Sequence, residues 1–193
     1  MNAPRTISRE DLAKLPIRRY EGKTIVVETP AHLDEALADF REETVVGLDT
    51  ETRPAFKKGE SHLPALVQVA TSRAVYLFQL RRAETHPVLA ALLGEARIVK
   101  AGVGLAHDLR TPKQVFEFAG QNILDLGSAA RSGGSGQTEV RNLAGIYLGF
   151  RIPKGASTSN WAVAQLSPKQ IAYAATDARS EERRVGKECR SRW

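Results

Sequence analysis

Five side chains of the types that bind metal ions and position water lie in three separate parts of the chain. Asp49 and Glu51 are two residues apart in GLDTET, Asp108 follows AGVGLAH, and Tyr173 and Asp177 are four residues apart in YAATDA. Carboxylate oxygens are the hard ligands that Mg²⁺ prefers in proteins. The four carboxylates are therefore candidate ligands for divalent cations.

Considered separately, each part of this set has a simpler interpretation. Asp49 and Glu51 project from the same face of an expected strand, where a pair of carboxylates is commonly solvated. Asp108 stands at an expected helix start, where the helix dipole favours a negative charge. Tyr173 and Asp177 share one face of an expected helix and are commonly surface residues. Their occurrence together, in this order along the chain, favours a common function.

The segments that carry these residues predict a sheet flanked by helices. β-Branched and aromatic residues between turn signals predict strands at residues 23–29, 44–52, 65–71, 74–80, 97–104 and 122–127. Helical spacing and cap residues predict helices at residues 29–43, 86–94, 106–120, 138–149 and from 167 onward. Only Ser72 and Arg73 separate the third strand from the fourth, which predicts a hairpin. The fold class is therefore α/β, with a mixed sheet.

These motifs resemble those of a known family. The resemblance rests on VVGLDTE, ALVQVAT, AGVGLAHDL, LAGIYLGFRIPKG, SNWA and LSPKQIAYAATDA. Such motifs are similar to those of the DEDD superfamily of 3′–5′ exonucleases, in the tyrosine-bearing branch that contains ribonuclease D. The resemblance covers residues 23–178 and implies a ribonuclease H-like fold, with a mixed five-stranded sheet flanked by helices.

The resemblance also implies a role for each of the five residues. Asp49, Glu51, Asp108 and Asp177 would hold two divalent cations, Mg²⁺ or Mn²⁺, whose charge balances that of the carboxylates. Tyr173 would orient the attacking water, because a phenol with a pKa near 10 is a poor base. The implied reaction is hydrolysis of phosphodiester bonds from the 3′ end, releasing nucleoside 5′-monophosphates. The alternative is a catalytically impaired nucleic-acid-binding module of the same fold.

Further side chains are candidates for contact with a single-stranded or 3′-ended nucleic acid, RNA or DNA. Basic residues would neutralise phosphates, and aromatic residues would stack on a base. The basic candidates are Lys57, Lys58, Arg141 and Lys154, and the aromatic ones are Phe56 and Trp161. The simpler interpretation is solvated charge for the basic residues and core packing for Trp161. No motif indicates contacts to the 2′-hydroxyl that separate RNA from DNA.

Composition limits the remaining classes of protein. With 193 residues, 42% of them hydrophobic and 26% charged, the chain has the size and composition of one globular domain. No apolar run approaches a membrane span, and the first residues lack a secretory apolar run, so we expect a cytoplasmic protein with no membrane partner. A single cysteine, Cys189, argues against a thiolate zinc cluster. GVGLAH lacks the third glycine of a dinucleotide-binding loop, which argues against a nucleotide-cofactor enzyme.

The last fifteen residues do not fit the pattern that precedes them. RSEERRVGKECRSRW has Val185 as its one aliphatic residue, and a DNA read beginning AGATCGGAAGAGCGTCGT, which resembles a sequencing adapter, encodes its first six residues. We therefore expect residues 1–22 to be an extension, 23–178 the exonuclease domain with its C-terminus truncated, and 179–193 a non-native tail. We also expect the loss of apolar packing after Ala178 to loosen Asp177. Six of the 28 basic and three of the 22 acidic residues lie in this tail, so the net charge of +6 becomes +3 without it.

Overall fold

One mixed sheet organises the molecule. The structure, a computed structural model, describes residues 6–57, 59–105 and 112–190, with side chains of the last helix described as far as Glu182. The sheet order is β1-β4-β3-β2-β5-β6, in which β3 is antiparallel to both β2 and β4 and the other pairs are parallel. The strands are β1 (Lys23–Val26), β2 (Val45–Thr52), β3 (Pro64–Ala70), β4 (Ala74–Gln79), β5 (Val99–Gly102) and β6 (Ile123–Asp125).

The predicted α/β class, the mixed sheet and the β3–β4 hairpin are all confirmed. Each of the six segments predicted as strands overlaps one strand of the sheet. The five-stranded count implied by the family resemblance is wrong, because the described residues alone form a sheet of six strands. Short β6 pairs in parallel with β5, from Lys100 opposite Ile123 to Gly102 opposite Asp125, and so contributes to the count.

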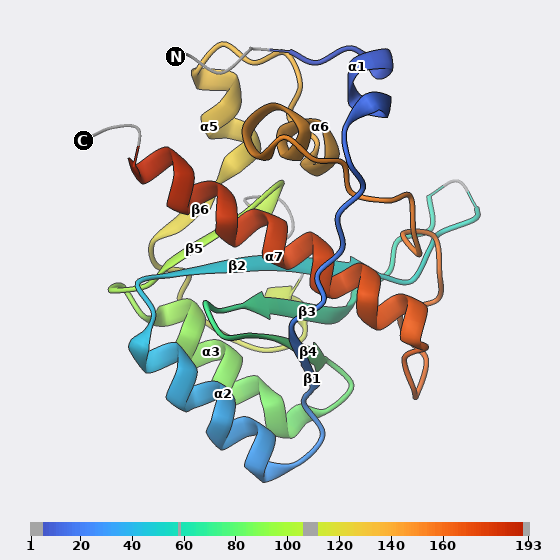
Figure 1. Ribbon diagram of the computed structural model, residues 1–193. Coiled ribbons are helices and arrows are strands. Elements are labelled where there is room, and N and C mark those ends of the chain that lie inside the picture. The colour runs from blue at the N-terminus through green and yellow to red at the C-terminus, as the bar shows by residue number, and fades with distance from the viewer. Residues whose placement is uncertain (1–5, 58, 106–111, 191–193) are drawn as a thin grey trace.

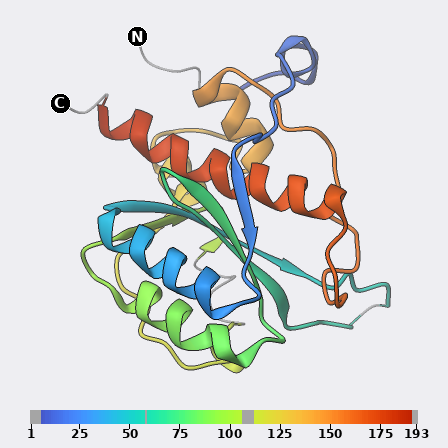
Figure 2. The same cartoon turned by 60° about the horizontal axis from the view of Figure 1, so that its bottom comes forward.

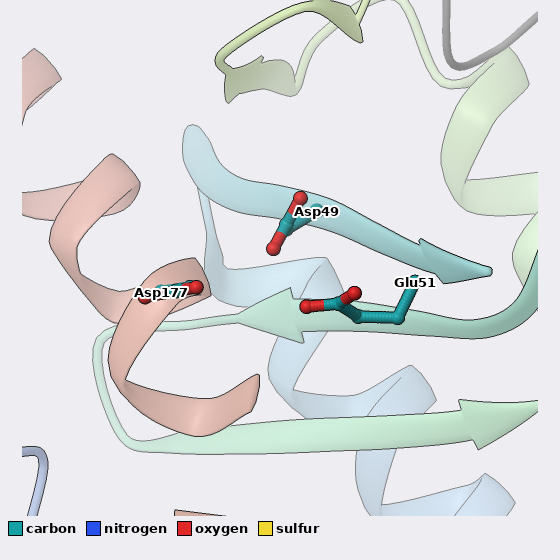
Figure 3. Close-up of side chains that lie close together, drawn as sticks. All are labelled: Asp49, Glu51 and Asp177. Carbon is teal, nitrogen blue, oxygen red and sulfur yellow. The ribbon is translucent and has the colours of Figure 1, made fainter. Parts of the chain in front are cut away.

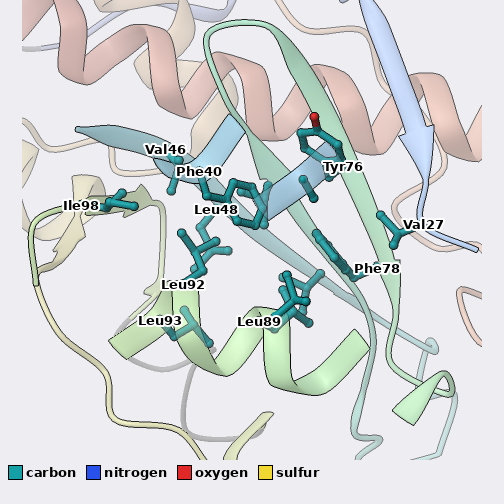
Figure 4. Packing of buried hydrophobic residues seen from close by; sticks show 14 of the residues in the cluster. Val27, Phe40, Val46, Leu48, Tyr76, Phe78, Leu89, Leu92, Leu93 and Ile98 are labelled. Carbon is teal, nitrogen blue, oxygen red and sulfur yellow. The ribbon is translucent and has the colours of Figure 1, made fainter. Parts of the chain in front are cut away.

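Helices cover both faces of this sheet (Figure 1; Figure 2). On one face, α2 (Pro30–Glu42) and α3 (His86–Gly94) enclose the larger core, which includes Phe40, Leu48 and Phe78 (Figure 4). Each such side chain contributes about 1.5–3 kcal/mol of burial. On the other face, α7 (Pro168–Arg190) crosses the strands and encloses a second core. Its buried residues are Leu66, Ala70, Val75, Leu77, Ala156, Trp161, Ala174, Ala175 and Ala178.

The start of α7 follows the predicted capping pattern. Ser167 Oγ accepts from the Gln170 backbone N–H at 3.3 Å, and Gln170 Oε1 accepts from the Ser167 N–H at 2.9 Å. These reciprocal bonds satisfy donors at the helix start, and Pro168 follows in the first turn. The local sequence therefore fixes where the helix that carries Tyr173 and Asp177 begins.

The helix predicted at residues 106–120 is wrong in its described part. Residues 106–111 lie outside the described residues, and after them only a 3₁₀ turn, η2 (Pro112–Gln114), is present before β6. Phe116 stacks on His86 with ring centroids 5.0 Å apart, and Phe116 and Phe118 both pack against the larger core. Aromatic packing against that core therefore prevails over the helical spacing. The remaining helical elements are α1 (Arg9–Lys14), η1 (Ala83–Thr85), α5 (Leu126–Ser132), α6 (Val140–Leu143) and η3 (Ala144–Leu148).

The N-terminal segment lies along α6, η3 and α7 (Figure 1). Ile7 exchanges two hydrogen bonds with the side chain of Gln137, at 2.9 and 3.0 Å. Arg151 donates its N–H to Pro16 O, and the Tyr20 N–H donates to Thr176 Oγ1 at 3.1 Å. These contacts tie residues 7–20 to the elements next to α7.

We expected α7 to lose its packing after Ala178, and this is wrong for the residues that directly follow. Helix α7 continues, and Arg179 donates to the carbonyl oxygens of Thr71 and Ser72. The carboxylate of Glu181, which is 1% exposed, accepts from the Val103 N–H at 3.0 Å. The packing of Asp177 therefore does not depend on an aliphatic residue after Ala178. The origin of residues 179–193 stays a prediction.

No helix among the described residues is long and apolar enough to cross a membrane.

Candidate active site

Strand β2 presents its acidic residues to α7. Val46 and Leu48 belong to the core on the side of α2 and α3. Side chains alternate along a strand, so Gly47, Asp49 and Glu51 face the opposite side. A Cβ atom built on Gly47 would overlap the carbonyl oxygen of Ala178, which confirms that this side of β2 lies against α7.

Helix α7 adds a third carboxylate to this pair. Asp49, Glu51 and Asp177 each offer an oxygen, and these oxygens all lie within 4.8 Å of one another. Figure 3 shows the three carboxylates gathered between β2 and α7. Asp177 is 4% exposed, and Asp49 Oδ1 accepts from the Thr50 N–H at 2.8 Å. Residues separated by about 130 positions in the sequence thus form one cluster.

Gly47 explains why the helix comes so close. Any larger residue there would push away the backbone of α7 at Ala178 and Glu182. Asp177 directly precedes Ala178, and Asp49 is two residues after Gly47, so the same approach brings the two carboxylates together. Gly47 lies within VVGLDTE, but its residue type and spacing alone predicted no role for it. A glycine inside a strand is the signal that marks such a close backbone approach.

Tyr173 lies one turn before Asp177 and is held from two sides. Its ring centroid is 6.0 Å from that of Trp161. A Cβ atom on Gly155 would overlap the Tyr173 ring, so the loop backbone at Gly155 lies directly against it. Trp161 is fully buried, which confirms the core-packing interpretation over base stacking.

The surroundings of Tyr173 favour its protonated form. Burial is the largest effect that raises the pKa of Tyr173, followed by the charge of Asp177, a hydrogen bond with Asp177 and the charge of Glu51. The positive charge of Arg141 acts in the opposite direction. The phenol therefore keeps its proton at neutral pH and is suited to hydrogen bonding.

The other candidates are less tightly grouped. Asp108 and Lys58 lie outside the described residues. Lys57 and Lys154 are exposed, and Phe56 is 84% exposed. These exposed side chains are accessible to a large ligand.

The carboxylate cluster fits divalent cations. Three carboxylates this close repel one another, and burial adds a desolvation cost for the charge of Asp177, which is 4% exposed. Mg²⁺ and Mn²⁺ favour such oxygen ligands and would neutralise the cluster. The donor set is therefore compatible with a metal centre.

A family model for 3′–5′ exonucleases matches residues 24–180. The chain belongs to the 3′–5′ exonuclease family. Among curated proteins, the chain is similar to the bifunctional 3′–5′ exonuclease/ATP-dependent helicase WRN of Mus musculus, with 33% identity over 141 residues. The match covers 69% of this chain and 10% of that relative. Ribonuclease D of Haemophilus influenzae is 29% identical over 140 residues, 71% of this chain and 34% of the relative. The chain thus spans a minor part of both relatives.

Solved structures share the fold of this exonuclease-family chain. The EXO domain of Nibbler from Aedes aegypti superposes with a TM-score of 0.71 at 21% identity, over 88% of this chain and 91% of that one. Ribonuclease D of Trypanosoma brucei in complex with RNA U12 superposes with a TM-score of 0.69 at 20% identity, over 92% and 64% of the two chains. The ribonuclease H-like expectation is confirmed.

Proposed function

We propose that the chain is a metal-dependent 3′–5′ exonuclease that removes nucleoside 5′-monophosphates from the 3′ end of a single-stranded nucleic acid. The observation that carries the proposal is the cluster of Asp49, Glu51 and Asp177, with Tyr173 beside it. Family membership supports the reaction class.

The proposed roles follow from the chemistry of each side chain. Asp49, Glu51 and Asp177, together with Asp108, hold two divalent cations. When bound, such cations lower the pKa of an attacking water and stabilise the departing 3′ oxygen. Tyr173 keeps its proton and orients the water by hydrogen bonding. Water adds to phosphorus and loses a proton to solvent, the bond between phosphorus and the 3′ oxygen breaks, and the 3′ oxygen takes up a proton from solvent.

RNA is the substrate that the relatives favour. Curated relatives include ribonuclease D, and one structural neighbour was solved with RNA. Exposed Phe56, Lys57 and Lys154 are suited to stack on a base and to neutralise phosphates. Arg141, whose charge acts on Tyr173, is suited to a phosphate near the cluster. The expected compartment is the cytoplasm.

The test compares 5′-labelled single-stranded RNA and DNA of the same sequence with Mg²⁺, Mn²⁺ or EDTA. The wild type is expected to shorten the strand stepwise with either cation and to stop with EDTA. Asp49→Ala is expected to bind the strand without shortening it. Binding without shortening by both proteins would instead support the impaired binding module, and shortening by both would remove Asp49 from the mechanism.

A further inference from the structure

Gln68 is a buried polar residue on the sheet face that packs against α7. It is 0% exposed, and within the described part of the chain neither its side-chain Nε2 nor its Oε1 has a hydrogen-bond partner. A buried amide without partners destabilises a fold, and in native proteins such a group calls for an explanation.

The position of Gln68 supplies that explanation. In the antiparallel pair of β2 and β3, Gln68 is directly opposite Asp49. Residues opposite each other in such a pair have side chains on the same face, with Cβ atoms about 4.5–5.5 Å apart. Gln68 therefore borders the carboxylate cluster.

The neighbours of Gln68 along β3 and directly across on β4 offer no alternative partner. Its cross-strand partner on β4 is Leu77, and the residues two positions away on β3 are Leu66 and Ala70. All three belong to the apolar core beneath α7. Glu51 on β2 and Gln79 on β4 can also accept a hydrogen bond. They are diagonal to Gln68, however, and therefore farther away than Asp49, which is directly opposite.

We propose that Gln68 is a positioning residue for the metal-binding carboxylates. Its side-chain NH₂ group has no partner among the described residues, and when the cluster binds a divalent cation it turns to donate to the Asp49 carboxylate and holds that carboxylate in the orientation that binds the cation. Hydrogen bonds to the ligands of a metal typically change metal affinity or activity by about 10–100-fold. This inference rests on the proposed function, because it assumes that the cluster binds cations.

The experiment uses Gln68→Met, which keeps the length and apolar volume of the side chain and removes the amide. The matched control is Gln79→Met on β4, because buried Gln79 donates from Nε2 to Val163 O at 2.9 Å and is opposite Leu66 in the sheet, not opposite a carboxylate. For each full-length protein, Mn²⁺ binding is measured by calorimetry, the melting temperature in EDTA, and kcat and KM on a labelled strand.

A positioning role predicts opposite effects on affinity and stability. Gln68→Met should weaken Mn²⁺ binding about tenfold or more and lower kcat with little change in KM, while its melting temperature in EDTA stays equal or rises. Gln79→Met should lose stability and keep wild-type Mn²⁺ affinity. Gln68→Asn, which keeps a shortened amide, should recover part of the Mn²⁺ affinity and provides a second test if Gln68→Met fails to fold.

Two results distinguish failure of this inference from failure of the proposed function. Wild-type Mn²⁺ affinity in Gln68→Met and Gln68→Asn, with a lowered melting temperature, would assign Gln68 a purely structural role and overturn the inference alone. If the wild type and Asp49→Ala bind Mn²⁺ equally, the metal centre itself is refuted, and the inference with it.

Discussion

Tyr173 illustrates how one side chain acquires a function from its surroundings. Its ring lies between Trp161 and the backbone at Gly155, and its pKa is raised mainly by burial and by Asp177. A tyrosine with a raised pKa stays protonated at neutral pH, so it acts as a hydrogen-bonding group. Even an ordinary phenol, with a pKa near 10, is a poor base at neutral pH. The raised pKa of Tyr173 therefore strengthens the prediction that it orients the water.

Tyr173→Phe tests that role. We expect kcat to fall about 100-fold, within the range that a positioned proton-handling group contributes. Mn²⁺ affinity should stay at the wild-type value, because the phenol is not a carboxylate ligand. Single-turnover shortening of a labelled strand and calorimetry measure the two quantities. A rate within threefold of wild type would remove Tyr173 from the mechanism.

Residue types and spacing predicted part of this site and missed the rest. Asp49, Glu51 and Asp177 were predicted as a set, and the structure brings their oxygens together. Gly47 and Gly155 were not predicted, since their importance depends on which backbone or ring lies against them, and that is a property of tertiary structure. The same holds for Gln68, because its burial and its position opposite Asp49 appear only in the sheet.

Strand β2 and helix α7 are the two elements that carry the described residues of the site. Gly47→Ala should force their backbones apart and destabilise the fold by about 1–3 kcal/mol, the usual effect of overpacking. Mn²⁺ affinity should fall as well, because Asp49 and Asp177 would separate. Gly120→Ala is the control, since its added Cβ meets nothing closer than 3.8 Å. Urea unfolding and calorimetry measure both effects, and a wild-type result for Gly47→Ala would contradict the close approach.

Strand β5 contains a buried lysine whose titration affects the stability of the sheet. Burial lowers the pKa of Lys100 to about 8, partly opposed by the charge of Glu95, and Lys100 Nζ donates to Glu95 O at 2.7 Å. The unfolded chain has the higher pKa, so it binds more protons between about pH 8 and 10.5. Stability from this group therefore rises with pH over that interval.

Lys100→Met should consequently be more stable than wild type at pH 7, by about 1–3 kcal/mol. The difference should shrink as the pH approaches 10, where the wild-type lysine is neutral. Urea unfolding at pH 7 and pH 9.5 measures the change, with exposed Lys169→Met as the control. Equal pH dependence in wild type and Lys100→Met would contradict the lowered pKa.

The positions of the strands were predicted well from the sequence, but the number of strands and the extent of one helix were not. Strong β-branched runs located all six strands, but the count of five came from the family resemblance, and three-residue β6 shows why short edge pairings are hard to count. The error at residues 115–120 has a different cause. Helical spacing there competes with the packing of Phe116 and Phe118 against the core, and propensity is weaker than such packing.

In the whole molecule, two segments outside the predicted domain of residues 23–178 pack against it. They are the N-terminal segment and the part of α7 that follows Ala178. Residues 7–20 hydrogen-bond to Gln137, Arg151 and Thr176, and Arg179 bonds the β3–β4 turn. The structure therefore integrates segments that sequence patterning placed outside the core. Patterning could not predict this because these contacts join polar groups far apart in the chain.

We still expect residues 179–193 to be foreign to the natural protein. Resequencing the locus from unassembled genomic DNA should give a reading frame that differs from this one after Ala178. The same fifteen codons inside a longer natural frame would refute the prediction. The contacts of Arg179 and Glu181 do not decide the matter, because they report how this chain packs and not where it came from.

We propose above all that Asp49, Glu51 and Asp177 hold the cations that drive hydrolysis at a 3′ end. The most direct measurement records Mn²⁺ binding and strand shortening over the same range of Mn²⁺ concentration, for the wild type, Asp177→Asn and the control Asp34→Asn, which changes an exposed carboxylate on α2. The wild type and Asp34→Asn should bind Mn²⁺ and shorten the strand at matching concentrations, and Asp177→Asn should do neither. Wild-type binding and shortening by Asp177→Asn would contradict the claim.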